Sequence, residues 1–280
     1  MTKALLFLSV FSSGLAFAQE DLLKDIDTIK TNTESSQPAF KALQIVTGQS
    51  TKLTAKKEWY IVVAHRFGDV STGFKNFFGL DNASTKLGAI YGITDAVSVS
   101  LSRETNMKTF EGSVKYRLLR QNDNFPVDIV GYNIMAVNTD LSKDNYPLLT
   151  FNDRLSYLTQ ALISRRFSDR LSVQLTPSYV HKNLYEPTIE DKNQFLAGLG
   201  GRYKISKRVS VNAEYFVNFD DHSFYRNPLS LGVDIETGGH VFQLLFTNSQ
   251  INSDIGYLTN ASGQWGKGHI FFGFNLYRVF

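Results

Sequence analysis

The chain has 280 residues, of which 42% are hydrophobic and 20% are charged, and it contains no cysteine. This balance excludes an intrinsically disordered protein and a disulfide-stapled scaffold. The 29 basic and 26 acidic residues leave a net charge of only +3, which gives no indication of a nucleic-acid partner. Aromatic residues make up 13% of the chain against 6 prolines, and this favours strands over helices.

The first residues, 1–18, are typical of a cleaved secretory signal peptide. Lys3 precedes an apolar run over 4–11, and the segment ends in the small-residue stretch 16–18. A membrane anchor needs roughly 20 apolar residues, and this run is shorter. We therefore expect export through the Sec pathway. No later apolar run reaches spanning length, which excludes a helical membrane protein.

Residues 19–57 differ in composition from the rest of the chain. They are rich in Asp, Glu, Lys, Thr, Ser and Gln, with short apolar patches such as Leu43–Val46. Apolar residues at near-helical spacing predict a short helix over 21–30. We interpret 19–57 as a periplasmic N-terminal segment with little hydrophobic core of its own.

From residue 58 to residue 280 the hydrophobic pattern has a period of two. Phe110, Val114 and Leu118, for example, alternate with charged and small polar residues, as in a strand with one apolar and one wet face. Twelve such runs can be counted. The expected strands span 58–67, 84–93, 96–104, 109–119, 127–137, 154–167, 171–181, 194–205, 208–219, 228–237, 240–248 and 269–280.

Alternation alone would also fit a soluble β-sandwich, so other features decide the fold class. Tight turns alternate with long polar connections, and a hairpin pattern recurs at 91–98, 166–172 and 203–210. Outer-membrane barrels have short periplasmic turns, long extracellular loops and an even strand number. We therefore predict an all-β protein of the outer membrane, a closed antiparallel transmembrane β-barrel of about 12 strands.

The end of the chain resembles the C-terminal strand by which outer-membrane barrels are recognised for insertion. Phe274 and Leu276 share one face of this strand, and the chain ends on Phe280. We expect these three residues to form a signal that the barrel assembly machinery reads. Arg278 departs from the pattern, although a basic side chain at the rim can reach the lipid head groups.

Four phrases carry a family resemblance: HRFG at 65–68, FGLD at 78–81, YGITD at 91–95 and KYRLLRQ at 115–121. Together they resemble a family of outer-membrane β-barrel proteins described as a domain of unknown function. The likeness is sharpest over 40–121. The resemblance implies the fold and the location, and it implies no activity, substrate or catalytic residue.

An enzyme that acts on lipids, like a phospholipase or a deacylase, is the alternative function. Its candidate residues are Ser178 and His181, with Asn183 as an orienting group. Residues three apart on a strand point to opposite faces, so a Ser–His hydrogen bond would need a bulge. The histidines are scattered, and no cysteine completes a metal site. We expect no enzymatic activity, no metal and no cofactor.

If the apolar face of each strand meets lipid, charged residues line the lumen. Mixed signs there fit either a salt-bridged plug or a pore with a slight preference for anionic solutes. The predicted lumen-lining residues, six basic and four acidic, are Lys86, Lys115, Arg117, Arg166, Arg202 and Lys204 with Glu111, Glu214, Asp234 and Glu236.

The sequence therefore predicts a porin-like barrel with outer-membrane lipid around it. The expected function is passive or facilitated passage of small polar solutes. A second alternative is a structural barrel with a closed lumen that displays its long loops to a binding partner, and the sequence does not exclude it. Twelve strands do not decide between them, because this number lies between filled small barrels and open porins.

Overall fold

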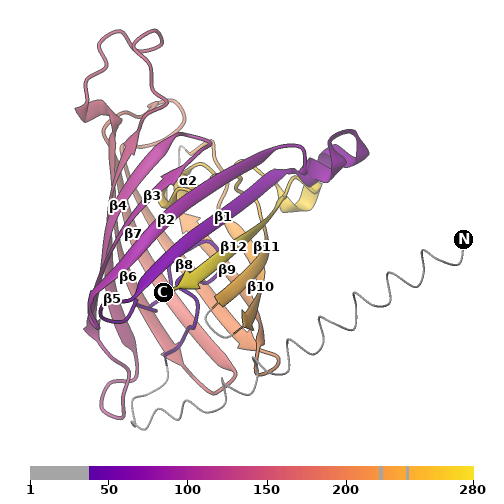
Figure 1. The fold of residues 1–280 in the computed structure, drawn as a ribbon. Helices are drawn as coiled ribbons and strands as arrows, with labels where there is room; N and C mark the ends of the chain where they lie inside the picture. Colours follow the sequence, from indigo (N-terminus) through magenta and orange to yellow (C-terminus); the bar gives the residue numbers. More distant parts are fainter. Residues whose placement is uncertain (1–37, 221–222, 238–239) are drawn as a thin grey trace, which may run out of the picture. The chain divides into compact units, whose positions relative to one another are not determined.

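The computed structural model describes residues 38–280 apart from 221–222 and 238–239. In that part of the chain twelve strands close into one antiparallel barrel, in which each strand pairs with its neighbours in sequence and the first strand pairs with the last (Figure 1). The strands are β1 (Trp59–Asp69), β2 (Ala83–Thr94), β3 (Val97–Glu104), β4 (Thr109–Leu119), β5 (Asp128–Asn138), β6 (Leu155–Arg166), β7 (Leu171–Lys182), β8 (Asn193–Lys204), β9 (Val209–Asn218), β10 (Leu229–Thr237), β11 (His240–Thr247) and β12 (Phe271–Val279).

The predicted fold class, a closed antiparallel barrel of twelve strands, is confirmed. Every strand begins and ends within two residues of its expected bounds. The predicted signal peptide over 1–18 and the predicted helix over 21–30 lie outside the described residues.

Alternate side chains point into and out of the barrel. On β4, Glu111 and Lys115 are buried in the interior, whereas Phe110 is 41% exposed on the outside. Exposed leucines recur on the outward face of other strands, among them Leu101 and Leu199. An apolar exterior of this kind is what lipid requires of a barrel wall.

The connections differ between the two rims of the barrel. Three of the turns at one rim, 95–96, 167–170 and 205–208, have at most four residues. At the other rim the connections include 139–154 and 248–270. We call these the short-turn rim and the long-loop rim. β1 begins and β12 ends at the short-turn rim, so the chain enters and leaves the barrel on the same side.

Among the described residues, four short helical elements lie in the connections of the long-loop rim. They are η1 (Val70–Gly79), η2 (Asn152–Arg154), α2 (Asp254–Thr259) and η3 (Trp265–Lys267). In the described part of the chain no helix is long and apolar enough to cross a membrane.

The hydrophobic core lies inside the barrel. The inward face of β5 and β6 carries the buried apolar side chains Val130, Leu158 and Leu162, beside the polar Gln160 and Ser164. Residues of α2 and Leu53 pack against this surface. β5 and β6 therefore have apolar residues on both faces, because the outer face meets lipid and the inner face packs against α2 and Leu53.

Candidate functional site

The lumen is occupied by the chain's own N-terminal segment, residues 39–55, which we call the plug. Its apolar side chains Phe40, Leu43, Ile45 and Val46 are at most 3% exposed. This placement differs from the expected periplasmic segment 19–57 with little core of its own. The apolar patches that are too sparse to form a separate core are buried against the barrel wall instead.

Inward-facing amides of the wall bind the backbone of the plug. A backbone N–H or C=O group that is buried without a hydrogen-bond partner destabilises the fold. The plug is shielded from water and pairs with no strand of the described barrel, so the side-chain amides of the wall supply these partners. The bonds run from Gln243 Nε2 to Ile45 O (2.7 Å), from Asn275 Nδ2 to Val46 O (2.8 Å), from Gln174 Nε2 to Gln49 O (2.8 Å) and from Thr51 N to Gln174 Oε1 (3.0 Å).

Lys115 holds the middle of the plug from β4. Its ammonium donates to the Oε1 atom of Gln49 at 2.8 Å and to the carbonyl oxygen of Ser50 at 3.2 Å. The side chain is also 5.4 Å from the ring centre of Tyr132. Lys115, one of the residues predicted to line the lumen, therefore contacts the plug.

Small residues of the wall leave room for the plug. A Cβ atom at Gly92 would lie 1.8 Å from the carbonyl oxygen of Ala55, and one at Gly200 would lie 2.7 Å from Ile45 Cδ1. Both distances are shorter than van der Waals contact. The wall at these positions fits the occupied lumen closely.

A second insertion comes from the long-loop rim. All residues of α2 are buried. The Asp254 carboxylate lies 2.6 Å from Lys86 Nζ, and the same ammonium lies 2.6 Å from Glu111 Oε2. Asp254 also accepts a hydrogen bond from the Tyr132 hydroxyl at 2.9 Å. The single cation offsets part of the charge of the two carboxylates, and hydrogen bonds from the Tyr132 hydroxyl to Asp254 and from the Asp254 amide to Glu111 (2.7 Å) stabilise the rest in a dry interior.

Glu214 on β9 connects the two insertions. Its Oε1 atom accepts hydrogen bonds from the backbone amides of Thr47 (2.7 Å) and Gly48 (2.8 Å) in the plug. The same atom accepts a hydrogen bond from the Tyr257 hydroxyl of α2 (2.8 Å). The residue is 2% exposed. A single buried carboxylate thus holds both the plug and the inserted loop.

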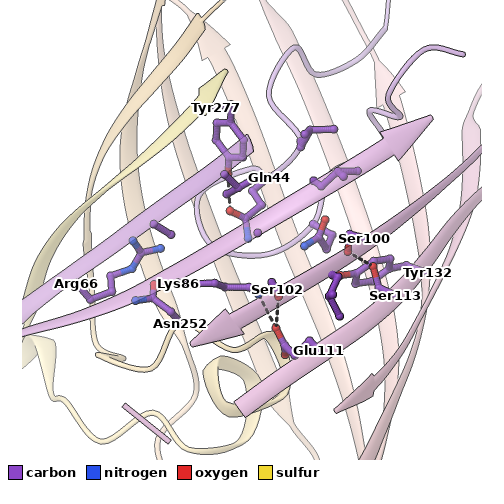
Figure 2. A pocket seen from close by; sticks show the side chains of 17 residues that line it. Gln44, Arg66, Lys86, Ser100, Ser102, Glu111, Ser113, Tyr132, Asn252 and Tyr277 are labelled. Atoms are coloured by element: carbon purple, nitrogen blue, oxygen red, sulfur yellow. Dashed lines mark hydrogen bonds and ion pairs between the residues drawn. The ribbon is translucent and has the colours of Figure 1, made fainter. Parts of the chain in front are cut away.

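Figure 2 shows the space that remains between the plug and strands β1 to β5. Gln44 of the plug faces Lys86, Ser100 and Glu111 across it, and the Tyr277 hydroxyl donates to the Gln44 side chain. The cavity has a volume of about 40 Å³. This is room for a few water molecules rather than for a solute.

A larger cavity of about 240 Å³ opens at the long-loop rim, and we call it the vestibule. Lys182 lies 2.5 Å from Glu190 and donates to Asn260 at 3.1 Å, so a buried ion pair forms part of its lining. Hydrogen bonds from the backbone and the hydroxyl of Thr150 hold the pKa of Asp153, at its edge, below the usual range. Further polar and aromatic residues that line it are Asn138, Tyr146, Arg154, Tyr185, Glu186 and Tyr225.

The ten charged residues expected in the lumen occupy inward-facing positions of their strands, and they fall into two groups. Six lie deep in the barrel, and four are half-buried near the short-turn rim. The deep group is Lys86, Glu111, Lys115, Arg202, Glu214 and Asp234; the rim group is Arg117, Arg166, Lys204 and Glu236.

The lumen charges do not simply pair with one another across an empty space. Lys86 and Glu111 form such a pair, but Lys115 and Glu214 bind the plug. At the rim, Glu236 lies 2.5 Å from the plug residue Lys41. The sequence predicts either an open pore or a lumen closed by salt bridges between wall residues. Neither arrangement includes a segment of the chain inserted into the lumen.

Several residues that hold the insertions were not singled out from the sequence. Gln174, Gln243 and Asn275 are single amides on amphipathic strands, where they look like an ordinary wet face. Arg66 is 1% exposed, and its guanidinium donates to Asn275 Oδ1 at 2.8 Å. Its place in the HRFG phrase is the one sequence signal that pointed to it.

The candidate residues of the alternative, a lipid-acting enzyme, are not brought together. Ser178 is buried inside the barrel and accepts a hydrogen bond from Gln160 at 2.9 Å. His181 points the other way and bonds to Asn193 (2.7 Å) and Asn183 (3.0 Å). The two side chains lie on opposite faces of β7, as the spacing implies, and the alternative is not supported.

The residues expected to signal assembly lie along the seam where the barrel closes. Phe274 stacks on His65 of β1 with ring centres 5.4 Å apart. The backbone of Phe280 exchanges two hydrogen bonds with that of Trp59. Leu276 lies on the same outward face as Phe274. Their recognition by the assembly machinery stays a prediction.

Solved structures with a similar fold include two named the NanC porin and the KdgM porin. Each has a TM-score of 0.51 and 10% sequence identity, and each match covers 79% of this chain, with 98% of NanC and 99% of KdgM. An outer membrane channel from Pseudomonas putida F1 matches with a TM-score of 0.44 and 13% identity, over 82% of this chain and 97% of its own. At 10% identity the likeness to the two porins establishes the fold alone. No curated protein matches the chain.

The sequence matches the family described as a membrane bound beta barrel domain over residues 40–280. The matched range includes nearly all of the plug as well as the twelve strands. A closed antiparallel barrel with an apolar exterior is the architecture of outer-membrane proteins. The chain therefore belongs to this family of membrane-bound β-barrels, whose function is unknown, and it is an outer-membrane protein.

Proposed function

We propose that the protein is a channel for small polar solutes and that the plug closes its lumen in the present conformation. The observation that carries this proposal is how the plug is held. Its contacts with the wall are side-chain hydrogen bonds and apolar packing, and its one β-bridge joins Gln44 to Gln49 within the plug itself. The barrel closes through β1 and β12 without it.

Removing the plug would therefore leave the strand ladder complete. The wall that it uncovers carries Arg66, Lys115 and Glu214 together with amides and hydroxyls. Water can satisfy the polar groups of such a surface once the plug no longer does so. The polar lining supports a water path that exists when the plug is displaced.

The vestibule supports a role for polar solutes at the outer end of this path. It combines tyrosine rings with an arginine, carboxylates and amides, a set of groups that can bind a polar organic molecule. The similar folds of the NanC and KdgM porins agree with passage of a solute, and at 10% sequence identity they do not identify the solute of this chain. A channel of this kind needs no catalytic residue.

Conductance in planar bilayers tests the proposal. We expect the full-length chain to show low or intermittent conductance, and a variant that lacks 39–55 to conduct steadily. Faster migration on unboiled gels would show that the shortened barrel is folded, because a closed ladder resists detergent. A folded variant that conducts no better than the bare bilayer would contradict a channel and favour a closed structural barrel.

A further inference from the structure

The β1–β2 connection exposes an unusual amount of apolar surface. Its element η1 and the residue after it present Phe74 (86% exposed), Phe77 (59%), Phe78 (41%) and Leu80 (39%). Lys75 lies among them and is also exposed. A contiguous aromatic surface on a protein marks a contact with lipid or with a partner.

The conformation of η1 is fixed, so the aromatic residues are not exposed through lack of structure. Asp69 accepts a hydrogen bond from the Ser71 amide at 2.8 Å, and the Val70 amide donates to the carbonyl oxygen of Ile270 at 2.9 Å. Phe77 and Phe78 both have a positive φ, at 42° and 55°. This backbone region is strained for a residue other than glycine.

Close packing behind the aromatic residues holds this strained turn. Gly79 has a φ of +87°, and a Cβ atom there would lie 2.3 Å from the carbonyl oxygen of Gly68. The connection therefore turns tightly on itself and presents its phenylalanines outward. A strained, ordered turn with exposed rings is unfavourable in water unless another apolar surface covers the rings.

The surface next to η1 already faces lipid. Phe67 and Phe272 lie on the outward face of β1 and β12 and stack with ring centres 5.7 Å apart, and η1 begins three residues after Phe67. Figure 1 shows η1 at the end of the β1–β2 pair, beside the start of β12. The exposed rings therefore continue the lipid-facing aromatic surface beyond the end of the strands.

We propose that η1 is an interfacial membrane anchor. Phe74, Phe77 and Phe78 insert into the outer leaflet of the membrane that holds the barrel, and Lys75 meets the anionic head groups there. Aromatic rings are the side chains that membrane interfaces favour, and a nearby cation adds attraction to anionic lipid. We assign lipid as the partner of this surface because the exposed rings of η1 continue the outward face of β1 and β12, which lipid covers.

Fluorescence of a single tryptophan tests the anchor. The chain has 2 tryptophans, Trp59 and Trp265, so the variant F74W is made in a W59F W265F background and reconstituted in phosphatidylcholine vesicles. We expect blue-shifted emission and quenching by lipids brominated on the acyl chain. The matched control is K143W, in another long connection, which should be quenched by iodide instead. Iodide quenching of F74W equal to that of K143W, without quenching by bromolipid, would overturn the proposal.

A second measurement keeps the natural tryptophans, in case their replacement impairs folding. Because the chain has no cysteine, F74C can carry the only nitroxide spin label. We expect the label to collide more often with oxygen than with a water-soluble nickel chelate, in contrast to a label at K143C. Higher access to nickel would refute insertion. Spin–spin broadening that persists when the protein is diluted with lipid would refute it in favour of contact with a second copy.

Discussion

Replacing Glu214 with alanine should release the plug. The carboxylate accepts two short hydrogen bonds from the plug amides of Thr47 and Gly48, a longer one from the amide of Val46 (3.3 Å) and one from the Tyr257 hydroxyl. Without it, these plug amides stay buried and lose this partner, and the two short bonds set the scale of the loss. An unsatisfied buried donor costs roughly 1–3 kcal/mol, so two amides cost about 2–6 kcal/mol.

This cost falls on the closed conformation, because in the open one water can reach the amides. At 1.4 kcal/mol for each factor of ten, the open population should rise by at least about 25-fold. Single-channel recording measures this as open probability. An independent assay is maleimide labelling of V46C in the plug, in a chain with no other cysteine; it should be faster in the Glu214→Ala background.

Glu104→Ala is the matched control. Glu104 is also a buried wall carboxylate with several donors, namely the hydroxyl of Ser84 and the amides of Asn106 and Met107. None of these donors belongs to the plug. If Glu214→Ala folds but changes neither open probability nor labelling relative to the control, Glu214 does not hold the plug closed and the reasoning fails.

Three further changes test other contacts of the lumen. Gly200→Leu places a large side chain where Ile45 of the plug packs, so the plug should be displaced and the conductance should rise. An unchanged conductance would contradict close packing at this position. Lys86→Met removes the cation between two buried carboxylates, which should cost about 3–5 kcal/mol and lower the urea midpoint, and an equal midpoint would contradict the pairing. Lys115→Glu with Arg117→Glu should raise conductance and shift the reversal potential in a salt gradient toward cations; indifference of both would place these side chains away from the path.

The barrel could be predicted because the sequence pattern that specifies each strand involves only residues close together in the chain. Alternation along β4, with Phe110 outside and Glu111 inside, depends on neighbouring residues and on the single requirement that one face meets lipid. The turns of the short-turn rim, such as 95–96, are short enough to be recognised in the same way. This is why all twelve strands lie within two residues of their expected positions.

The plug could not be predicted from its own sequence. Its residues have neither a helical nor a strand period, and the partners that hold it are far away in the chain, such as Glu214 for Thr47. The wall residues that bind it, like Gln243 and Asn275, have the composition of any wet face. Only the fold brings these positions together, so the sequence left the state of the lumen open.

The most direct test of the central claim is the conductance of the variant without residues 39–55, measured beside the full-length protein in the same bilayers. The account predicts steady channels in the shortened barrel and low or intermittent conductance in the intact one. A shortened barrel that is folded by its gel mobility and still does not conduct would contradict it.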